Sequence, residues 1–190
     1  MSGTIELPRV RAVLSARKAV RLDYTRRAAV ALVLSGAESS PAALLVRRAE
    51  RPGDPWSGHM ALPGGHEQHG DRELLHTARR ETLEEVGLNL ERAELLGELD
   101  DLTPMRAATL LVRPFVFWLP EPGPLSHSHE VAESLWVPLA ELSHGNLRTT
   151  REVQVASTTL TVPTFVISDR VVWGMTFHLL ERFLREMSAP

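Results

Sequence analysis

Cysteine is absent from this chain of 190 residues. Its absence excludes disulfide bonds, catalysis by a thiol and metal sites built from thiolates, and it fits a reducing compartment. Long hydrophobic runs are missing as well. No apolar stretch approaches the ~18 residues that a membrane-spanning helix needs, and the basic N-terminal residues lack the apolar segment of a secretory signal. We therefore expect a cytoplasmic protein that does not enter a membrane.

The sequence also lacks an excess of one charge. The formal net charge is −3 at pH 7, so no basic surface points to nucleic acid, and the acidic excess is too small to indicate a basic partner. Hydrophobic residues make up 43% of the chain, which is enough for a core, and the length is typical of one domain. We expect residues 28–190 to form that domain, with residues 1–27 as a lead-in that belongs to it.

Apolar periodicity predicts an α/β fold, an α/β/α sandwich with a mixed β-sheet. Strands are expected at residues 28–34, 42–46, 95–99, 110–119 and 134–137, followed by a hairpin of residues 153–156 and 160–162. Pro114 indicates that its strand is an edge strand or contains a bulge. Besides the helix described next, helical segments are expected within residues 1–27, at 138–142 and at 172–187.

Three glutamates on one predicted helix are the most informative cluster of the chain. Glu81, Glu84 and Glu85 stand at i, i+3 and i+4, so a helix places them on one face, where like charges repel unless a cation lies between them. Asp71 is the expected N-cap of this helix, and Gly87 is its expected left-handed stop. The alternative is a solvated helix face, since charged side chains mostly lie exposed. As ligands, these carboxylates suit Mg²⁺ or Mn²⁺.

Residues around the glutamates fit a site for such an ion. Gly64 and Gly65 permit a tight turn and a close approach of the backbone to its neighbours. Arg80 is placed to pair with a neighbouring glutamate and to fix its orientation.

The combined pattern resembles the Nudix box, Gly-x5-Glu-x7-Arg-Glu-U-x-Glu-Glu-x-Gly-U, in which U is aliphatic. The match is close over Arg80-Glu81-Thr82-Leu83-Glu84-Glu85-Val86-Gly87-Leu88, with Thr82 in an aliphatic position. Upstream it is displaced by one residue, because Asp71 precedes the expected glutamate and Gly65 precedes the expected glycine. The resemblance implies the Nudix-type sandwich and metal-dependent hydrolysis of a nucleoside diphosphate derivative, with Mg²⁺ or Mn²⁺ held by Glu81, Glu85 and Glu84.

Sequence outside the box resembles the coenzyme A pyrophosphatase branch of this family. The segments that carry the resemblance are residues 44–48 and 58–65 before the box and residues 97–104, 112–116, 130–131, 136–139 and 172–176 after it, and those after the box fit best. That branch usually has Leu-Arg-x-His-x-Gly-Gln before its Pro-Gly-Gly, whereas this chain has Pro55-Trp56-Ser57-Gly58-His59. The resemblance implies CoA or a CoA derivative as substrate. The alternatives are an oxidised nucleoside triphosphate, a nucleotide sugar or a dinucleotide, or a Nudix-like sensor domain without turnover.

The residues expected to contact the substrate are Arg47, Trp56, His59, Gly64, Gly65 and Asp100. Arg47 ends a predicted strand, where it either meets a phosphate or lies on the surface, and Trp56 either stacks on an adenine or does not contact the ligand. The alternatives are that His59 is a solvated loop histidine and that Asp100 is a turn or cap residue. The expected partner is a small-molecule nucleotide, with no nucleic acid and no membrane. A homodimer is left open.

Catalysis is expected to use Arg80, Glu81 and a glutamate that takes a proton from water. Glu84 is one candidate for this base. Glu130 or Glu133 from a later loop is the other, since Nudix enzymes differ in where the base comes from. If CoA is the substrate, the products are 4′-phosphopantetheine and adenosine 3′,5′-bisphosphate.

Overall fold

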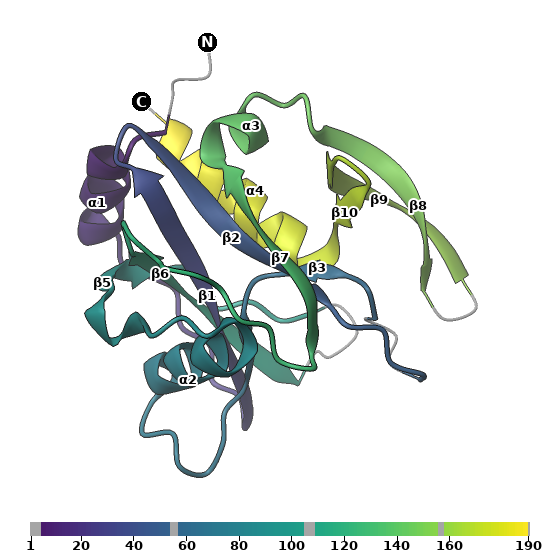
Figure 1. Cartoon of the computed structure of the whole chain (residues 1–190), viewed down its shortest axis with the longest axis horizontal. Helices are drawn as coiled ribbons and strands as arrows, with labels where there is room; N and C mark the ends of the chain where they lie inside the picture. Colours follow the sequence, from purple (N-terminus) through teal and green to yellow (C-terminus); the bar gives the residue numbers. More distant parts are fainter. Residues whose placement is uncertain (1–4, 54–56, 105–108, 156–157, 190) are drawn as a thin grey trace.

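Two β-sheets and four α-helices make up the described part of the chain, residues 5–53, 57–104, 109–155 and 158–189, in this computed structural model (Figure 1). The larger sheet contains β1 (Arg26–Ala37), β2 (Ser40–Arg48), β3 (Met60–Ala61), β4 (Gly64–His66), β5 (Glu94–Glu98), β6 (Leu110–Trp118) and β7 (Val131–Pro138). The helices are α1 (Leu7–Ala16), α2 (Leu74–Val86), α3 (Leu139–Ser143) and α4 (Gly174–Ser188), with a 3-10 turn, η1 (Leu90–Arg92).

The larger sheet is mixed, as the sequence predicts. Its main order is β3-β2-β1-β6-β5, while β4 also pairs with β1 and β7 with β2. The β1–β6 pair is parallel, and the other pairs of this sheet are antiparallel. The predicted hairpin of β1 and β2 is confirmed, with Ala37 opposite Ser40 across the turn.

Strand β6 lies inside the sheet, between β1 and β5, so the prediction that Pro114 marks an edge strand is wrong. Proline removes an N–H, but the Pro114 carbonyl still accepts a hydrogen bond from the backbone N–H of Leu99 at 3.0 Å. The irregularity lies in the neighbouring strand, because the register of β5 shifts between Leu95 and Gly97.

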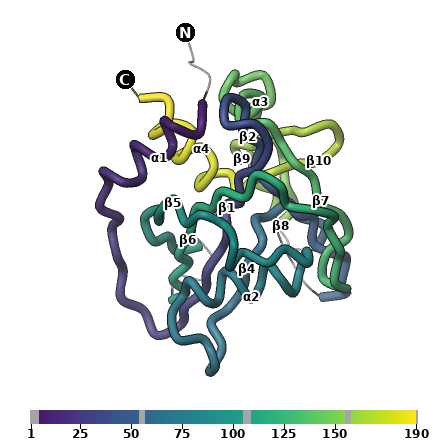
Figure 2. The backbone as a smooth tube through the Cα atoms, turned by 60° about the vertical axis from the view of Figure 1, so that its left-hand side comes forward, coloured from purple at the N-terminus to yellow at the C-terminus, as the bar shows by residue number. Residues whose placement is uncertain are grey.

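Both faces of the sheet are buried, which explains why β1 is apolar without alternation. One set of β1 side chains packs on the side of α1 and α4: Ala28, Val30, Leu32 and Leu34. The alternate set packs on the side of α2: Ala29, Ala31 and Val33. Figure 2 shows α1 beside α4 near the two chain ends, with α2 across the sheet from them. The predicted sandwich is therefore confirmed.

A second, three-stranded sheet extends from the sandwich on the right of Figure 1. It consists of β8 (Arg148–Val155), β9 (Thr158–Ile167) and β10 (Arg170–Val172), all antiparallel. The predicted late hairpin is confirmed, although its strands are longer than expected. Strand β10 was not expected, and it takes Val172, so α4 begins two residues later than predicted.

The helix expected within residues 1–27 is α1, which buries Leu7, Val10 and Leu14. Its face packs on the same core as α4. Within the described residues, no helix is both long and apolar enough to cross a membrane.

Candidate active site

The glycine turn lies directly against two glutamates of α2. Glu85 is 7% exposed, and its Oε2 accepts a hydrogen bond from the backbone N–H of Gly64 at 3.0 Å. A Cβ on Gly65 would lie 2.5 Å from Cδ of Glu81. Gly64 has φ +152°, and a Cβ there would lie 2.2 Å from the carbonyl oxygen of Ala29. Only glycine fits this close approach, as the sequence predicts.

The three glutamates divide into a pair and a neighbour. Glu81 and Glu85 are one helical turn apart and both lie at the glycine turn. The side chain of Glu84 is 55% exposed and its Oε2 accepts a hydrogen bond from Nη1 of Arg80 at 3.1 Å. The single shared face is therefore confirmed for the pair, while Glu84 lies toward solvent.

Arg80 joins the helix to the loop before it. Its Nη1 donates to Oε1 of Glu81 at 2.8 Å, which confirms the expected pairing with a neighbouring glutamate. Its Nε and Nη2 donate to the two carboxylate oxygens of Asp71 at 3.1 and 2.9 Å, and Nη2 also donates to the carbonyl of His66 at 3.1 Å. The guanidinium thus fixes the orientation of Glu81 from a site that is itself held on several sides.

The prediction that Asp71 caps α2 is wrong. The N-cap is Glu73, without a side-chain cap, and Asp71 instead accepts hydrogen bonds from Arg80, from the Thr77 hydroxyl at 2.9 Å and from the Gln68 N–H at 3.0 Å. The hydrogen bonds from Arg80 are the main reason that the pKa of Asp71 falls to about 2. Asp71, which lies one residue before the expected glutamate position of the pattern, is therefore the partner of Arg80.

Burial disfavours the charged forms of Glu81 and Glu85. It is the main cause that raises the pKa of Glu85 to about 7; the Gly64 N–H opposes the shift, and the nearby charges of Glu81 and Glu130 add to it. Burial is also the main cause that raises the pKa of Glu81, against the lowering effect of Arg80. The buried Glu85 carboxylate, the half-buried Glu81 carboxylate and a third carboxylate nearby form a place where a cation would be stabilised.

The donor set fits a hard divalent ion. Carboxylate oxygens are the ligands that Mg²⁺ and Mn²⁺ prefer. No group of three His, Asp or Glu side chains in the described residues is already arranged as a metal cage. Glu84 is hydrogen-bonded to Arg80, and it would have to leave Arg80 to join Glu81 and Glu85. The pair is thus the part of the predicted ligand set that the structure brings together.

The two later candidates for the base differ in their surroundings. Glu133 accepts hydrogen bonds from Nε and Nη2 of Arg170 at 2.8 and 2.6 Å, and these bonds are the main cause that lowers its pKa. A carboxylate held in this way attracts a proton weakly. Glu130 forms an ion pair with Arg51 at 3.1 Å and acts electrostatically on the glutamate pair. Of the two, Glu130 is the better placed.

A cleft of about 650 Å³ opens between the two sheets. Arg47 and His59, both predicted to contact substrate, line it. Trp56 lies outside the described residues. The ring of Trp173 packs edge-on against His59 with 4.9 Å between ring centroids, so this tryptophan belongs to the wall of the cleft. Sequence reasoning missed Arg151 in β8, because nothing in its local pattern shows that this strand lines the same cleft as His59.

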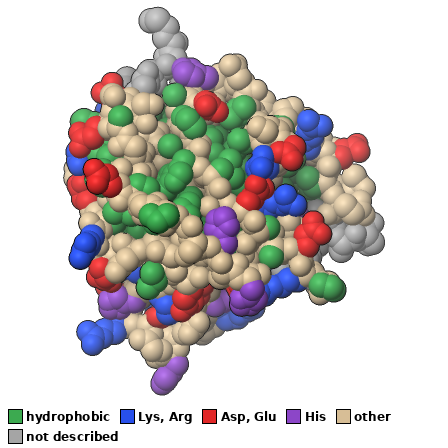
Figure 3. All heavy atoms as spheres, in the orientation of Figure 1, with side chains coloured by type: hydrophobic (Ala, Val, Ile, Leu, Met, Phe, Trp, Pro, Cys, Tyr) green, Lys and Arg blue, Asp and Glu red, His purple; other side chains and the backbone are tan. Residues whose placement is uncertain are grey.

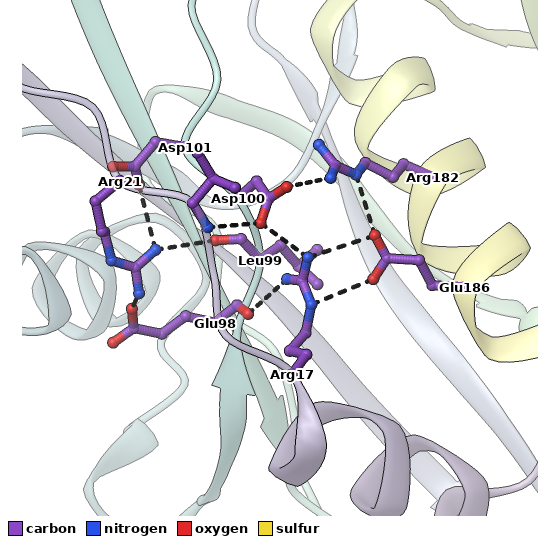
Figure 4. A network of polar contacts seen from close by, with 9 residues as sticks. Arg17, Arg21, Glu98, Leu99, Asp100, Asp101, Arg182 and Glu186 are labelled. Carbon is purple, nitrogen blue, oxygen red and sulfur yellow. Dashed lines mark hydrogen bonds and ion pairs between the residues drawn. The ribbon is translucent and has the colours of Figure 1, made fainter.

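The structure does not bring Asp100 to this cleft. Asp100 is buried and binds Arg17 at 2.9 Å, Arg182 of α4 and the backbone N–H of Val20 at 2.8 Å. Figure 4 shows these groups joining the N-terminal segment, the segment after β5 and α4. These contacts indicate that Asp100 holds three segments of the chain together. Its role is therefore structural, as in the alternative that Asp100 is a turn or cap residue.

Comparisons with known proteins agree with this site. A model of the NUDIX domain matches residues 25–157. An uncharacterized Schizosaccharomyces pombe protein is 39% identical over 140 residues, 62% of this chain, and the match spans 43% of that protein. The mitochondrial coenzyme A diphosphatase NUDT8 of Homo sapiens is 32% identical over 165 residues, which cover 86% of this chain and 70% of NUDT8.

Solved structures share the fold. A NUDIX hydrolase from Alicyclobacillus acidocaldarius superimposes with a TM-score of 0.56 at 19% identity, covering 89% of this chain and 95% of that one. A MutT protein from Methanosarcina mazei gives a TM-score of 0.53 at 20% identity, covering 89% and 100%. With the domain match, the glycine turn and the α2 carboxylates, the chain belongs to the NUDIX family and is a hydrolase of phosphoric anhydride bonds.

Proposed function

We propose that this enzyme hydrolyses the diphosphate of coenzyme A or of a CoA derivative, releasing 4′-phosphopantetheine and adenosine 3′,5′-bisphosphate. The observation that carries the proposal is that the half-buried Glu81 and the buried Glu85 lie beside a large cleft. Met60 lines the cleft and Gly64 bonds to Glu85. Four residues of chain span at most about 14 Å, so one elongated ligand reaches both places. Support also comes from NUDT8, whose name describes a coenzyme A diphosphatase.

Glu81 and Glu85 would hold the divalent ion that Nudix hydrolases generally need, with Glu84 as a third ligand or as a base. When bound, such an ion neutralises charge on phosphoryl oxygens and lowers the pKa of a bound water. Arg80 holds the Glu81 carboxylate in place. Glu130 is the proposed acceptor of the proton from the attacking water, and the oxygen of that water ends on one of the two released phosphates.

A substrate panel tests the proposal. Coenzyme A, a dinucleotide, a nucleotide sugar and an oxidised nucleoside triphosphate are each incubated with the enzyme and Mg²⁺ or Mn²⁺, and the product masses are read. The expected result is the highest kcat/KM on coenzyme A, with the masses of 4′-phosphopantetheine and adenosine 3′,5′-bisphosphate. Faster turnover of another class would replace the CoA assignment. Binding of nucleotide without product from any substrate would indicate a sensor domain instead.

A further inference from the structure

We propose that the cleft between the two sheets holds the phosphate-bearing nucleoside half of the substrate, and that Arg151 of β8 recognises the phosphate on that half. The inference rests on the proposed function and adds to it the residue that selects the substrate. Arg151 lines the cleft, on the opposite side from Arg47 of β2 and His59.

The walls of the cleft come from different parts of the chain. The NUDIX domain match ends at residue 157, whereas a large share of the lining lies beyond it, from Val166 to Trp173. Residues 166–173 are held to β7 of the larger sheet by the paired hydrogen bonds of Arg170 to Glu133, at 2.8 and 2.6 Å. The hydrolytic carboxylates and Arg151 of β8 lie within the matched residues, whereas β9 and β10 complete the cleft from beyond them. Specificity for the leaving group is therefore expected to depend on side chains of this cleft and not on the carboxylates alone.

The three arginines of the cleft differ in their availability to a ligand. Arg170 is engaged by Glu133 and, at 2.6 Å, by Asp169. With the residues that the structure describes, Arg47 forms long contacts, 3.5 Å to Glu133 and 3.7 Å to an exposed Glu50. Arg151 forms no hydrogen bond or ion pair with any residue that the structure describes. Its guanidinium is an exposed donor fork, and this fork matches the geometry of a phosphate.

Acidic residues that line the cleft offset the positive charge of its arginines. Figure 3 shows Lys and Arg side chains interleaved with Asp and Glu side chains on the side where β8–β10 lie. No broad positive field therefore draws in any polyanion, so an anion must be selected by a local contact. Phosphopantetheine offers no further anionic group beyond the diphosphate. The nucleoside half of CoA carries a 3′-phosphate, which gives Arg151 a partner.

The aromatic pair of the cleft also fits a nucleoside. His59 and Trp173 meet edge to face, with ring planes at 69°, and both line the cleft. Each is half-buried, so part of an aromatic surface remains open to a ligand. A purine base packs favourably on such a surface. One cleft thus combines a surface for the base with a cation for the phosphate.

The test measures how the enzyme discriminates between CoA and 3′-dephospho-CoA. The variants are Arg151→Gln and, as a control with the same loss of charge, Arg185→Gln, which removes an exposed arginine of α4 outside this cleft. The Arg151→Gln variant should lower the preference for CoA by about tenfold, through KM rather than kcat. The Arg185→Gln control should keep the wild-type preference. Calorimetry with adenosine 3′,5′-bisphosphate in EDTA should show the same weakening of binding in Arg151→Gln alone.

The outcomes separate the inference from the proposed function. If the wild type hydrolyses CoA and Arg151→Gln keeps the wild-type preference and binding, the proposed function stands and the inference is wrong. Equal wild-type turnover of CoA and 3′-dephospho-CoA would also overturn it. Weaker turnover of both substrates by the same factor in Arg151→Gln would place the pantetheine half in the cleft. If the wild type hydrolyses neither compound, both the inference and the proposed function fail.

Discussion

Replacing Glu85 by glutamine should abolish turnover and, at the same time, stabilise the metal-free protein. Glu85 is 7% exposed, and the pKa of its carboxyl rises to about 7 from a reference of 4.5. A difference of about 2.5 pKa units corresponds to about 3 kcal/mol. The glutamine side chain has nearly the same shape, and its oxygen still accepts the hydrogen bond from Gly64. What the substitution removes is a negative charge in a buried site.

The sign of the pH dependence follows from the direction of this shift. Between about pH 4.5 and pH 7, the folded metal-free protein holds a proton on Glu85 that the unfolded chain has released. The free energy of unfolding therefore falls as the pH rises through this window, by about 3 kcal/mol from this group, and stays low above it. The Glu85→Gln variant lacks this loss. At pH 8 in EDTA it should be more stable than the wild type by up to that amount.

Guanidinium unfolding at pH 5, 6, 7 and 8, with EDTA or with Mg²⁺, measures these differences. Glu84→Gln is the comparison, because it removes the same charge from a side chain that is 55% exposed, and stability there should change by less than about 0.5 kcal/mol. Mg²⁺ should stabilise the wild type at pH 8 and have little effect on Glu85→Gln. Turnover should fall by more than the ~10–100-fold that loss of a metal's outer partner costs. Near-normal hydrolysis by Glu85→Gln would contradict its role as a metal ligand, and a pH profile of stability identical to the wild type would contradict the raised pKa.

Three further substitutions test the glycine turn, Arg80 and the contacts of Asp100, which lies outside the cleft. Gly65→Ala places a Cβ 2.5 Å from Cδ of Glu81, so we expect a large loss of kcat with nearly normal thermal unfolding, and normal kcat would contradict the close packing. Arg80→Lys keeps the charge but loses the paired hydrogen bonds to Asp71, so kcat should fall about 10–100-fold with a smaller change in KM. Asp100→Asn breaks the contacts with two arginines and should cost about 3 kcal/mol in urea unfolding while kcat/KM stays within about twofold. The pKa of the Asp100 carboxyl is lowered, so its stabilising effect should disappear as the pH falls below about 4, and a large loss of activity at unchanged stability would return it to the substrate site.

Local signals explain which elements the sequence predicted well. Apolar runs with turn residues between them predicted β1 and β2, and the left-handed Gly87, with φ 73°, ends α2 where expected. These features depend on neighbours in the chain, so they are visible without a tertiary structure. Strand β10 is short and its pairing with β9 depends on a tight turn around Ser168, with φ 56°, so periodicity could not show it.

Partner choice is a property of the folded molecule. Asp71 is a residue type that commonly caps helices, yet it pairs with Arg80, because the loop before α2 brings its carboxylate back along the helix. Pro114 is a residue type typical of edge strands, yet β6 is internal and pairs with both β1 and β5. In each case the residue type allows several roles, and long-range packing selects one of them.

Residues close together in the chain were enough to predict the chemistry of this protein. Two glycines, an arginine and carboxylates one helical turn apart indicate a Nudix hydrolase, because helical spacing and glycine geometry are local properties. Which glutamates act as a pair depends instead on the long-range packing of the folded chain. Burial against the glycine turn separates Glu81 and Glu85 from the exposed Glu84. The tertiary structure also decided that the wall of the cleft comes from a second sheet, since contacts between residues about 100 positions apart depend on how the whole chain packs.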